Sequence, residues 1–310
     1  MLKFTLRQLE YAVQTADSGS VAAAAVILHV AQPSVSTALK KLEDTIGLQI
    51  FIRHHAQGLT PTSRGSVFLA DARRLLAHSE ELARQSDAQT GPLKGRLHVG
   101  SFVTLAPTYA PILISKFNAL NPGVEIVLEE GVQGELLNGL RHGQHDVALI
   151  YDVDLPADIE AKEVASLKPY VLLSASHKLA RFKTISLSNL ANEKLILLDI
   201  QPSRTYFLRL LEAQGVKPVI GFSSASLELV RGMVARGLGY SLLITRPAGD
   251  QSYDGEKLSV HEIAGIAERG VIAIAHLKNV RQTRVAQVFE KFCIDYFKTV
   301  RNSIQRNYGK

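Results

Sequence analysis

Residues 20–47 read SVAAAAVILHVAQPSVSTALKKLEDTIG and predict two helices joined by a tight turn. Ser20 is a natural N-cap for a short apolar helix over 21–28. The second helix begins at Gln32 and Pro33, because proline is tolerated where the first-turn N–H has no helical partner. Gly47 ends it. One face is then apolar and the other polar: Val35, Leu39, Leu42 and Ile46 lie opposite Pro33, Ser34, Thr37, Lys40 and Lys41, with Ser36 at the edge.

This polar face has the chemistry of a DNA-reading helix. Hydroxyl and amide side chains can hydrogen-bond to base edges, the helix N-terminus attracts phosphate, and lysines neutralise further phosphates. A small three-helix core with a solvated polar face would show the same spacing, so spacing alone leaves DNA binding open. The candidate DNA-binding residues of this helix are Gln32, Pro33, Ser34, Ser36, Thr37, Lys40 and Lys41.

The flanking segments complete a small domain. An amphipathic helix over 5–17 precedes the pair, and two short β-like runs within 48–61 surround a polar turn that contains glycine. These runs predict a hairpin, or wing, with Arg53, His54 and His55 near its tip. Arg53 and His54 join the candidate DNA-binding residues. Adjacent side chains on a strand point to opposite faces, so we do not expect His54 and His55 to share a metal ion.

A long helix is predicted over 62–89, about 40 Å in length at 1.5 Å per residue. Its apolar residues recur at spacings of three and four, which is typical of a short coiled-coil-like seam. We therefore predict a linker helix that mediates dimerisation; an ordinary helix packed on its own domain is the alternative. The candidate dimerisation residues are Phe68, Leu69, Ala72, Leu75, Leu76 and Leu82.

The composition limits the class of protein. The 310 residues are 46% hydrophobic and 21% charged, typical of a globular chain with room for more than one core. Cys293 is the only cysteine, which excludes an internal disulfide framework and a sensor based on a cysteine pair; we expect it in a core. Neither a membrane-spanning stretch nor a signal peptide is evident, so we expect a cytoplasmic location and no membrane partner.

The charge is unevenly distributed. The net charge is +6 and the pI about 9.3, which favours a polyanionic partner. Yet residues 1–90 hold nine Lys or Arg against eight Asp or Glu, a net of +1, whereas residues 278–310 hold eight against two, a net of +6. The prediction of DNA binding therefore rests on where particular side chains lie, and the basic C-terminal tail remains a separate feature.

The chain changes character near residue 91, where Gly91, Pro92 and Gly95 interrupt any helix. Beyond that point, apolar β-like runs alternate with helical segments. This order predicts a parallel sheet with helices on both sides. The expected strands lie at 96–101, 124–128, 146–151, 170–175, 195–199, 219–222, 240–244 and 271–276.

Residues 5–65 resemble the winged helix-turn-helix of the LysR-type transcriptional regulators. The matching positions are Leu6-Arg7-Gln8-Leu9-Glu10-Tyr11, Gly19-Ser20, Leu28-His29-Val30-Ala31-Gln32-Pro33-Ser34-Val35-Ser36, Leu42-Glu43, Gly47, Phe51 and Leu59-Thr60-Pro61-Thr62. Three positions depart from the family pattern. Ala22 and Ala23 replace a polar and a basic residue, and Ala31 replaces the Ser or Thr that caps the recognition helix. The resemblance therefore implies DNA binding with fewer contacts to the backbone.

The resemblance extends over 91–310. Gly143-Gln144-His145-Asp146-Val147-Ala148-Leu149 and residues 230–240, VRGMVARGLGY, are similar to signatures of the family's effector domain. The implied fold class is α/β, with a two-lobed effector domain like a periplasmic binding protein. The domains are a winged helix-turn-helix over 1–61, a linker helix over 62–90 and an effector-binding domain over 91–310. By analogy, lobe one comprises 91–162 and 271–310, and lobe two 163–270.

An effector is expected between the lobes, at loops that follow strand ends. Helix N-termini with hydroxyl groups suit a small organic anion, and Arg204 would add bidentate geometry. Plain N-capping is the alternative role for the serines. The candidate effector-binding residues are Ser101, Phe102, Thr104, Gln133, Tyr151, Ser203, Arg204, Ser224 and Ser226.

These features predict a sequence-specific transcriptional regulator controlled by a small-molecule effector; the alternative is a solute-binding or sensory protein that never touches DNA. The chain has no nucleophile motif, phosphate loop or metal-spaced Cys/His cluster. We therefore expect no enzymatic activity, no catalytic or metal site and no cofactor. The expected partners are double-stranded DNA with a pseudo-palindromic site, the effector, further copies of the chain as a dimer or tetramer, and RNA polymerase.

Overall fold

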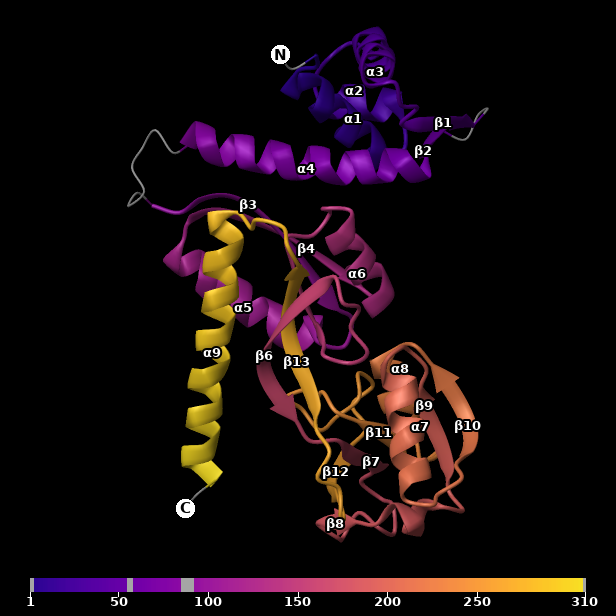
Figure 1. Cartoon of the computed structure of the whole chain (residues 1–310). Coiled ribbons are helices and arrows are strands. Elements are labelled where there is room, and N and C mark those ends of the chain that lie inside the picture. Colours follow the sequence, from indigo (N-terminus) through magenta and orange to yellow (C-terminus); the bar gives the residue numbers. More distant parts are fainter. Residues whose placement is uncertain (1–2, 55–57, 85–91, 309–310) are drawn as a thin grey trace.

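A computed structural model describes residues 3–54, 58–84 and 92–308, and the side chains of these residues except Arg84 and those from 300 onward. His55 therefore lies outside the described residues. A helical N-terminal unit sits above the long helix α4, and two α/β lobes lie below it (Figure 1). The predicted order of a helical unit, a linker helix and a two-lobed domain is present.

The N-terminal unit contains α1 (Leu6–Ser18), α2 (Val21–Ile27) and α3 (Gln32–Ile46). The Ser20 hydroxyl caps α2 by accepting the N–H of Ala23 at 3.4 Å, and Gly47 ends α3 in the left-handed conformation. Of the described helices, none is long and apolar enough by itself to cross a membrane; α2 and α3 pass that test only as a pair bent by 114°. The core that α1, α2 and α3 share includes Leu9, Ala12, Val21, Ala25, Val35, Leu39 and Leu42.

The recognition helix α3 begins without a side-chain cap. Ala31 occupies the N-cap position in an extended conformation (φ −71°, ψ 137°) and has no hydroxyl to accept a first-turn N–H. Its carbonyl accepts the N–H of Ser34 at 2.9 Å. The missing cap noted in the sequence therefore leaves other first-turn donors of α3 to solvent or a ligand.

The wing consists of β1 (Phe51–His54) and β2 (Gly58–Pro61), paired antiparallel. The Glu43 carboxylate at the end of α3 accepts the N–H groups of Ile50 and Phe51 at 2.7 and 3.1 Å. Leu59 donates its N–H to the Gly19 carbonyl at 2.8 Å. The wing is thereby tied to α3 on one side and to the α1–α2 turn on the other.

The linker helix α4 spans Ser63–Arg84. A Cβ on Gly65 would lie 2.1 Å from the Ile50 carbonyl oxygen, so only glycine permits this close start. The dimerisation seam predicted for α4 needs correction. Leu69 and Ala72 are buried in the core of the N-terminal unit, and Phe68 and Leu76 pack against it. These four residues pack within their own chain and are not available for a dimer seam, whereas Leu75 and Leu82 remain exposed.

Lobe one is built on a five-stranded sheet of order β4-β3-β5-β13-β6. Helices α5 and α9 cover the face of the sheet that carries the Val99 and Ser101 side chains. Helix α6 covers the opposite face, where Leu136 lies against Gly100. The elements are β3 (Lys94–Phe102), α5 (Ala106–Leu120), β4 (Gly123–Gly131), α6 (Gln133–Arg141), β5 (Val147–Tyr151), β6 (Ile159–Leu167), β13 (Gly270–Leu277) and α9 (Arg284–Tyr308).

The prediction of a parallel sheet holds for only part of this lobe. Strands β3, β4 and β5 are parallel, but β13 is antiparallel to both β5 and β6. The reason is topological, since the chain leaves the lobe along β6 and returns along β13. The pairing of Leu167 with Gly270 also shows that the chain first passes from lobe one to lobe two after Leu167, and not after residue 162 as predicted. Strand β6 was missed because polar residues interrupt its apolar ones.

Lobe two contains an antiparallel group, β11-β7-β12, extended by β8 parallel to β12, and a separate parallel pair, β9 and β10. Strands β8 and β12 were not predicted. The elements are β7 (Tyr170–Ser174), β8 (Thr184–Ile185), η2 (Leu187–Leu190), β9 (Lys194–Leu198), α7 (Ser203–Ala213), β10 (Val219–Ser224), α8 (Leu227–Ala235), β11 (Ser241–Leu243) and β12 (Leu258–Ile263).

Helix α9 closes lobe one with an apolar face. The Phe289 ring meets Phe117 of α5 edge-on, with centroids 5.0 Å apart. Cys293 is fully buried in the same cluster, which confirms the prediction of a core cysteine, and burial raises the pKa of its thiol.

A buried carboxylate anchors α9 to the sheet. Glu290 Oε1 accepts from Lys162 Nζ at 2.5 Å, and its Oε2 lies 2.9 Å from His276 Nδ1 and 3.2 Å from Gln282 Nε2. Burial alone would raise the pKa of Glu290, but the nearby His276 ring and the hydrogen bonds from Lys162 and Gln282 lower it to about 2. The ionised carboxylate is therefore the form that the fold holds.

We predict that Ala31→Ser raises the free energy of unfolding by about 0.5–2 kcal/mol, because the added hydroxyl caps α3. Thermal unfolding of the full chain, followed by circular dichroism, measures the change. Ala22→Ser is the control, since it adds the same hydroxyl to an exposed residue of α2, a helix that Ser20 already caps. A melting temperature for Ala31→Ser at or below that of the unmodified chain would contradict the prediction.

We predict that Glu290→Gln destabilises the protein by on the order of 2 kcal/mol at pH 7. Because the folded state lowers the pKa of Glu290, its contribution is present above the ordinary glutamate value near 4.3 and is lost as pH falls toward 2. Urea unfolding at pH 7 and pH 3 should therefore show the deficit shrinking at low pH. Exposed Glu262→Gln serves as control, and an equal deficit at both pH values would refute the assignment.

Candidate nucleic-acid interface and interlobe site

The face of α3 that was predicted to read DNA is on the surface. Val35, Leu39 and Leu42 are at most 1% exposed and fix the rotation of the helix. The opposite residues are exposed, apart from half-buried Ser36; they are Gln32, Pro33, Ser34, Thr37, Lys40 and Lys41. Hydroxyl groups at the N-terminal end, with lysines one turn further on, can reach base edges and phosphates together.

The wing adds a second element beside α3. Arg53 and His54 are both exposed on β1. His54 Nε2 lies 2.8 Å from the Thr60 hydroxyl on β2, which orients the ring across the hairpin. The Arg53 side chain can therefore approach a phosphate backbone while α3 occupies a groove.

A chain of hydrogen bonds crosses between the two lobes. Tyr151, at the end of β5, lies 3.4 Å from the Thr104 hydroxyl and 2.5 Å from the Thr245 hydroxyl, measured from its phenol oxygen. Tyr170 of lobe two donates its hydroxyl to the Thr245 carbonyl at 3.0 Å. Burial raises the pKa of both tyrosines, which keeps their phenols neutral. Phe102 packs on Tyr151 with ring centroids 5.4 Å apart.

Gln133 approaches this junction from lobe one. It is the first residue of α6 and is 7% exposed. Its Nε2 donates to the Val153 carbonyl at 3.0 Å, while its Oε1 is buried and lacks a hydrogen-bond partner among the described residues. A buried acceptor without a partner is costly, so this oxygen is suited to a ligand that carries a donor.

The lobe-two candidates mostly serve their own helices. Ser226 caps α8 by accepting the Leu229 N–H at 3.3 Å, and Ser224 accepts the Ser226 N–H at 3.1 Å. Ser203 is the first residue of α7 and is buried. The Arg204 guanidinium lies 2.8 Å from Asp199, so its charge is already paired. N-capping, the alternative role, therefore describes Ser226.

Ser101 lies apart from the other candidates. It is 1% exposed and lines a small void inside lobe one with Leu113, Phe289 and Cys293. Strand alternation puts Ser101 on the α5 and α9 side of β3 and its neighbour Phe102 on the other. Thr245 and Tyr170, in contrast, belong to the junction and were missed. Thr245 lies just beyond β11, so the rule about strand ends could have found it.

No group of three or more His, Cys, Asp or Glu residues in the described part of the chain could hold a metal ion. Some of the described histidines instead lie near a single acid, such as His145 with Glu129 at 3.8 Å. The arrangement at α3 and between the lobes provides hydrogen bonding and charge for binding.

Comparison with known proteins places both halves of the chain in one family. Residues 6–66 match the family described as bacterial regulatory helix-turn-helix protein, lysR family, and residues 90–298 match the LysR substrate binding domain. The DNA-binding transcriptional dual regulator OxyR of Escherichia coli is 31% identical over 77% of this chain and 78% of its own length.

Solved structures agree with this assignment. HinK, a LysR family transcriptional regulator from Pseudomonas aeruginosa, is 41% identical with a TM-score of 0.64, covering 95% of this chain and 98% of HinK. Full-length OxyR C199D from the same species is 28% identical with a TM-score of 0.75, covering 94% and 98%. The chain belongs to the LysR family of transcriptional regulators, with a helix-turn-helix DNA-binding domain and a two-lobed effector-binding domain.

Proposed function

We propose that Ser34, Ser36 and Thr37 of α3 read base edges of an operator, while Lys40, Lys41 and Arg53 neutralise its phosphates. The single observation that carries this assignment is the exposed polar face of α3, fixed opposite a fully buried stripe. Gln32 and Pro33 start the helix, where uncapped N–H groups face an approaching phosphate. His54, which bridges the two strands of the wing through Thr60, lies beside Arg53 in the sequence and would contact the same backbone.

We propose that the chain assembles as a dimer, with a tetramer as the larger assembly, on a pseudo-palindromic site. Exposed apolar side chains support self-association. One row lies on α4, and two more lie at the free edges of the lobes, on β4 with α5 and on β10 with α8. The residues are Val67, Leu75 and Leu82; Ile112, Leu120 and Val127; and Val219, Ile220, Phe222 and Leu229.

We propose that a small organic anion binds between the lobes, against Thr104, Gln133, Tyr151 and Arg204. The N-termini of α6 and α7 would supply partial positive charge. Because Asp199 already pairs with Arg204, the ligand would compete for that guanidinium. The unpartnered Gln133 oxygen adds a preference for a hydroxyl or N–H group on the same ligand.

We further propose that the protein needs no cofactor and catalyses no reaction, that it acts in the cytoplasm, and that RNA polymerase is a further partner. Membership of a family of transcriptional regulators supports these assignments. The hydrogen-bonding groups between the lobes are suited to holding a ligand, and the neutral phenols of Tyr151 and Tyr170 are donors and acceptors for it.

We predict that Ser34→Ala and Lys40→Ala weaken DNA binding in different ways. Loss of a base contact should cost about 1–3 kcal/mol and relax specificity at one position, whereas loss of a phosphate contact should weaken binding to all sequences and reduce the salt slope by about one. Fluorescence anisotropy at several salt concentrations, on an operator selected from random DNA by the full chain, measures both effects.

The control for the DNA experiment is Lys217→Ala, an exposed lysine of lobe two. It should bind the operator as the unmodified chain does. Variants that all bind the operator equally would overturn the assignment of α3. A chain that selects no sequence from the random library would favour a protein that acts without DNA.

We predict that Gln133→Ala and Arg204→Ala each weaken binding of a small carboxylate by about tenfold, because each removes one hydrogen-bonding or charged partner. Isothermal titration of the full chain with a panel of small carboxylic and hydroxycarboxylic acids provides the measurement. Arg209→Ala, an exposed arginine on α7, is the matched control. A carboxylate bound equally by all three variants would rule out the junction between the lobes as its site.

A further inference from the structure

The linker helix α4 contacts lobe one of its own chain at the C-terminal end of α6. Arg73 Nη1 donates to the His142 carbonyl at 3.0 Å, and Arg74 Nη2 donates to the Arg141 carbonyl at 2.7 Å. Arg73 also pairs with Asp17 of α1. One guanidinium thus joins the DNA-binding unit, the linker helix and the effector domain.

The backbone at this contact is shaped for the approach of α4. Gly143 follows α6 with φ +65°, and a Cβ there would lie 3.2 Å from the Ala70 carbonyl oxygen and 3.5 Å from Arg73 Cβ. Glycine therefore serves two purposes, the left-handed turn and the close approach. It is also the first residue of the family signature over 143–149.

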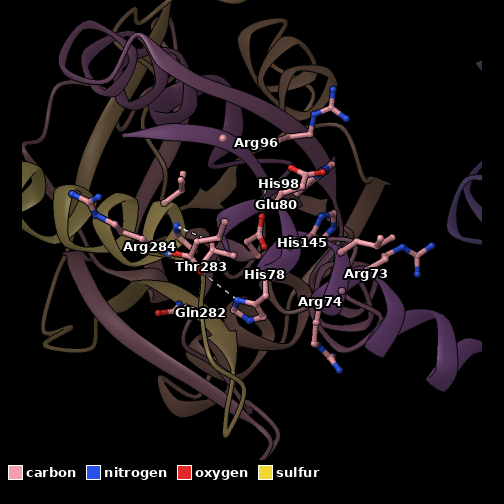
Figure 2. Close-up of a pocket in the computed structure, with 18 of the residues that line it drawn as sticks. Arg73, Arg74, His78, Glu80, Arg96, His98, His145, Gln282, Thr283 and Arg284 are labelled. Carbon is pink, nitrogen blue, oxygen red and sulfur yellow. Dashed lines mark hydrogen bonds and ion pairs between the residues drawn. The ribbon is translucent and has the colours of Figure 1, made fainter. Parts of the chain in front are cut away.

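A second contact lies at the N-terminal end of α9, beside a cavity of about 1150 Å³ between α4 and lobe one (Figure 2). Glu81 Oε1 accepts the Arg284 N–H at 2.8 Å, and its Oε2 lies 3.4 Å from His78 Nδ1. His78 Nε2 in turn lies 3.0 Å from the Arg281 carbonyl oxygen. A carboxylate of α4 therefore caps a helix of the effector domain.

The signs of these charges match the ends that they meet. A helix C-terminus carries partial negative charge and orphan carbonyls, and an N-terminus carries partial positive charge and orphan N–H groups. Helix α4 presents two arginines to the first and a glutamate to the second. Arg73 and Glu81 are separated by about 12 Å along α4, so the two contacts together define one orientation of α4 on the lobe.

We propose that this docking of α4 on the ends of α6 and α9 is the intramolecular contact through which the effector domain controls the DNA-binding unit. Helix α6 begins at Gln133, at the junction between the lobes, and ends beneath Arg73 and Arg74. Leu69 and Ala72 fix the other side of α4 in the DNA-binding core. A shift at the N-terminal end of α6, at the junction between the lobes, therefore reaches α4.

Helix α6 is suited to transmit such a shift as a rigid unit. Leu136, Leu137 and Leu140 are buried against the sheet, and a Cβ on Gly139 would lie 2.3 Å from the His145 ring. Close packing on this side resists bending and leaves displacement of the whole helix as the response. The control of α4 by an effector rests on the proposed function, whereas the docking itself does not.

Hydrogen exchange of the full chain, without DNA or effector, tests the docking. The double variant Arg73→Ala/Arg74→Ala and the single variant Glu81→Ala should each raise the exchange rates of α4 amides 74–82 by about tenfold, because the C-terminal half of α4 loses its support. The matched controls are Arg209→Ala/Lys217→Ala and Glu212→Ala, which alter exposed residues of lobe two.

Amides of β3 and β5 report in the same experiment whether lobe one stays folded. If Arg73→Ala/Arg74→Ala also raises exchange in these strands, the double variant Arg73→Lys/Arg74→Lys is measured in its place. It keeps the two charges and loses the forked geometry of the guanidinium groups. An intermediate increase over 74–82 supports docking. Unchanged exchange over 74–82 in all docking variants would overturn it.

A change at the N-terminal end of α6 tests the coupling through this helix. Gln133→Ala removes the bond to the Val153 carbonyl and should also raise exchange over 74–82. Gly134→Ala, whose added Cβ meets nothing within 4 Å, should not. No effect of Gln133→Ala would refute the coupling. Carboxylate titration of the same variants reports on the proposed cleft separately, so failure of that site leaves the exchange result decisive for docking.

Discussion

The burial of one side of α4 in the DNA-binding unit is the interaction on which the rest of this structure depends. Leu69 and Ala72 close the core that also holds Val35, Leu39 and Leu42 of α3, and this core sets the rotation of α3 so that its polar face points outward. The same burial fixes the other faces of α4. Arg73, Arg74 and Glu81 consequently meet the effector domain, and Leu75 and Leu82 remain exposed.

Two kinds of polar contact join parts of the molecule, and they differ in charge. One is neutral, and the other involves ionised side chains. Between the lobes, the Tyr151 and Thr245 hydroxyls share one neutral hydrogen bond that a polar ligand could replace. At the linker, guanidinium and carboxylate groups meet helix ends, where hydrogen bonds and dipole act together. The first kind of contact suits the proposed effector site, and the second suits the proposed docking of α4 on the effector domain.

Most of the local structure could be predicted because its causes are local. Ser20 and Gly47 mark helix ends through backbone chemistry that involves only neighbouring residues. The spacing of Val35, Leu39 and Leu42 predicted which face of α3 is buried. Reasoning failed where distant segments decide. Strand β13 is antiparallel because of where the chain re-enters lobe one, and Ser101 lies in the core because β3 places its odd-numbered side chains beneath α5 and α9.

The sequence by itself determined the family, the recognition face of α3 and the two-lobed plan, because periodicity, capping and motif spacing are properties of short segments. Only the tertiary structure decided which apolar residues of α4 serve its own domain and which stay exposed. Periodicity shows that a face is apolar but does not name what covers it. The joining of α4 to α6 and α9 was likewise beyond the sequence, since it depends on backbone groups brought together from segments more than sixty residues apart.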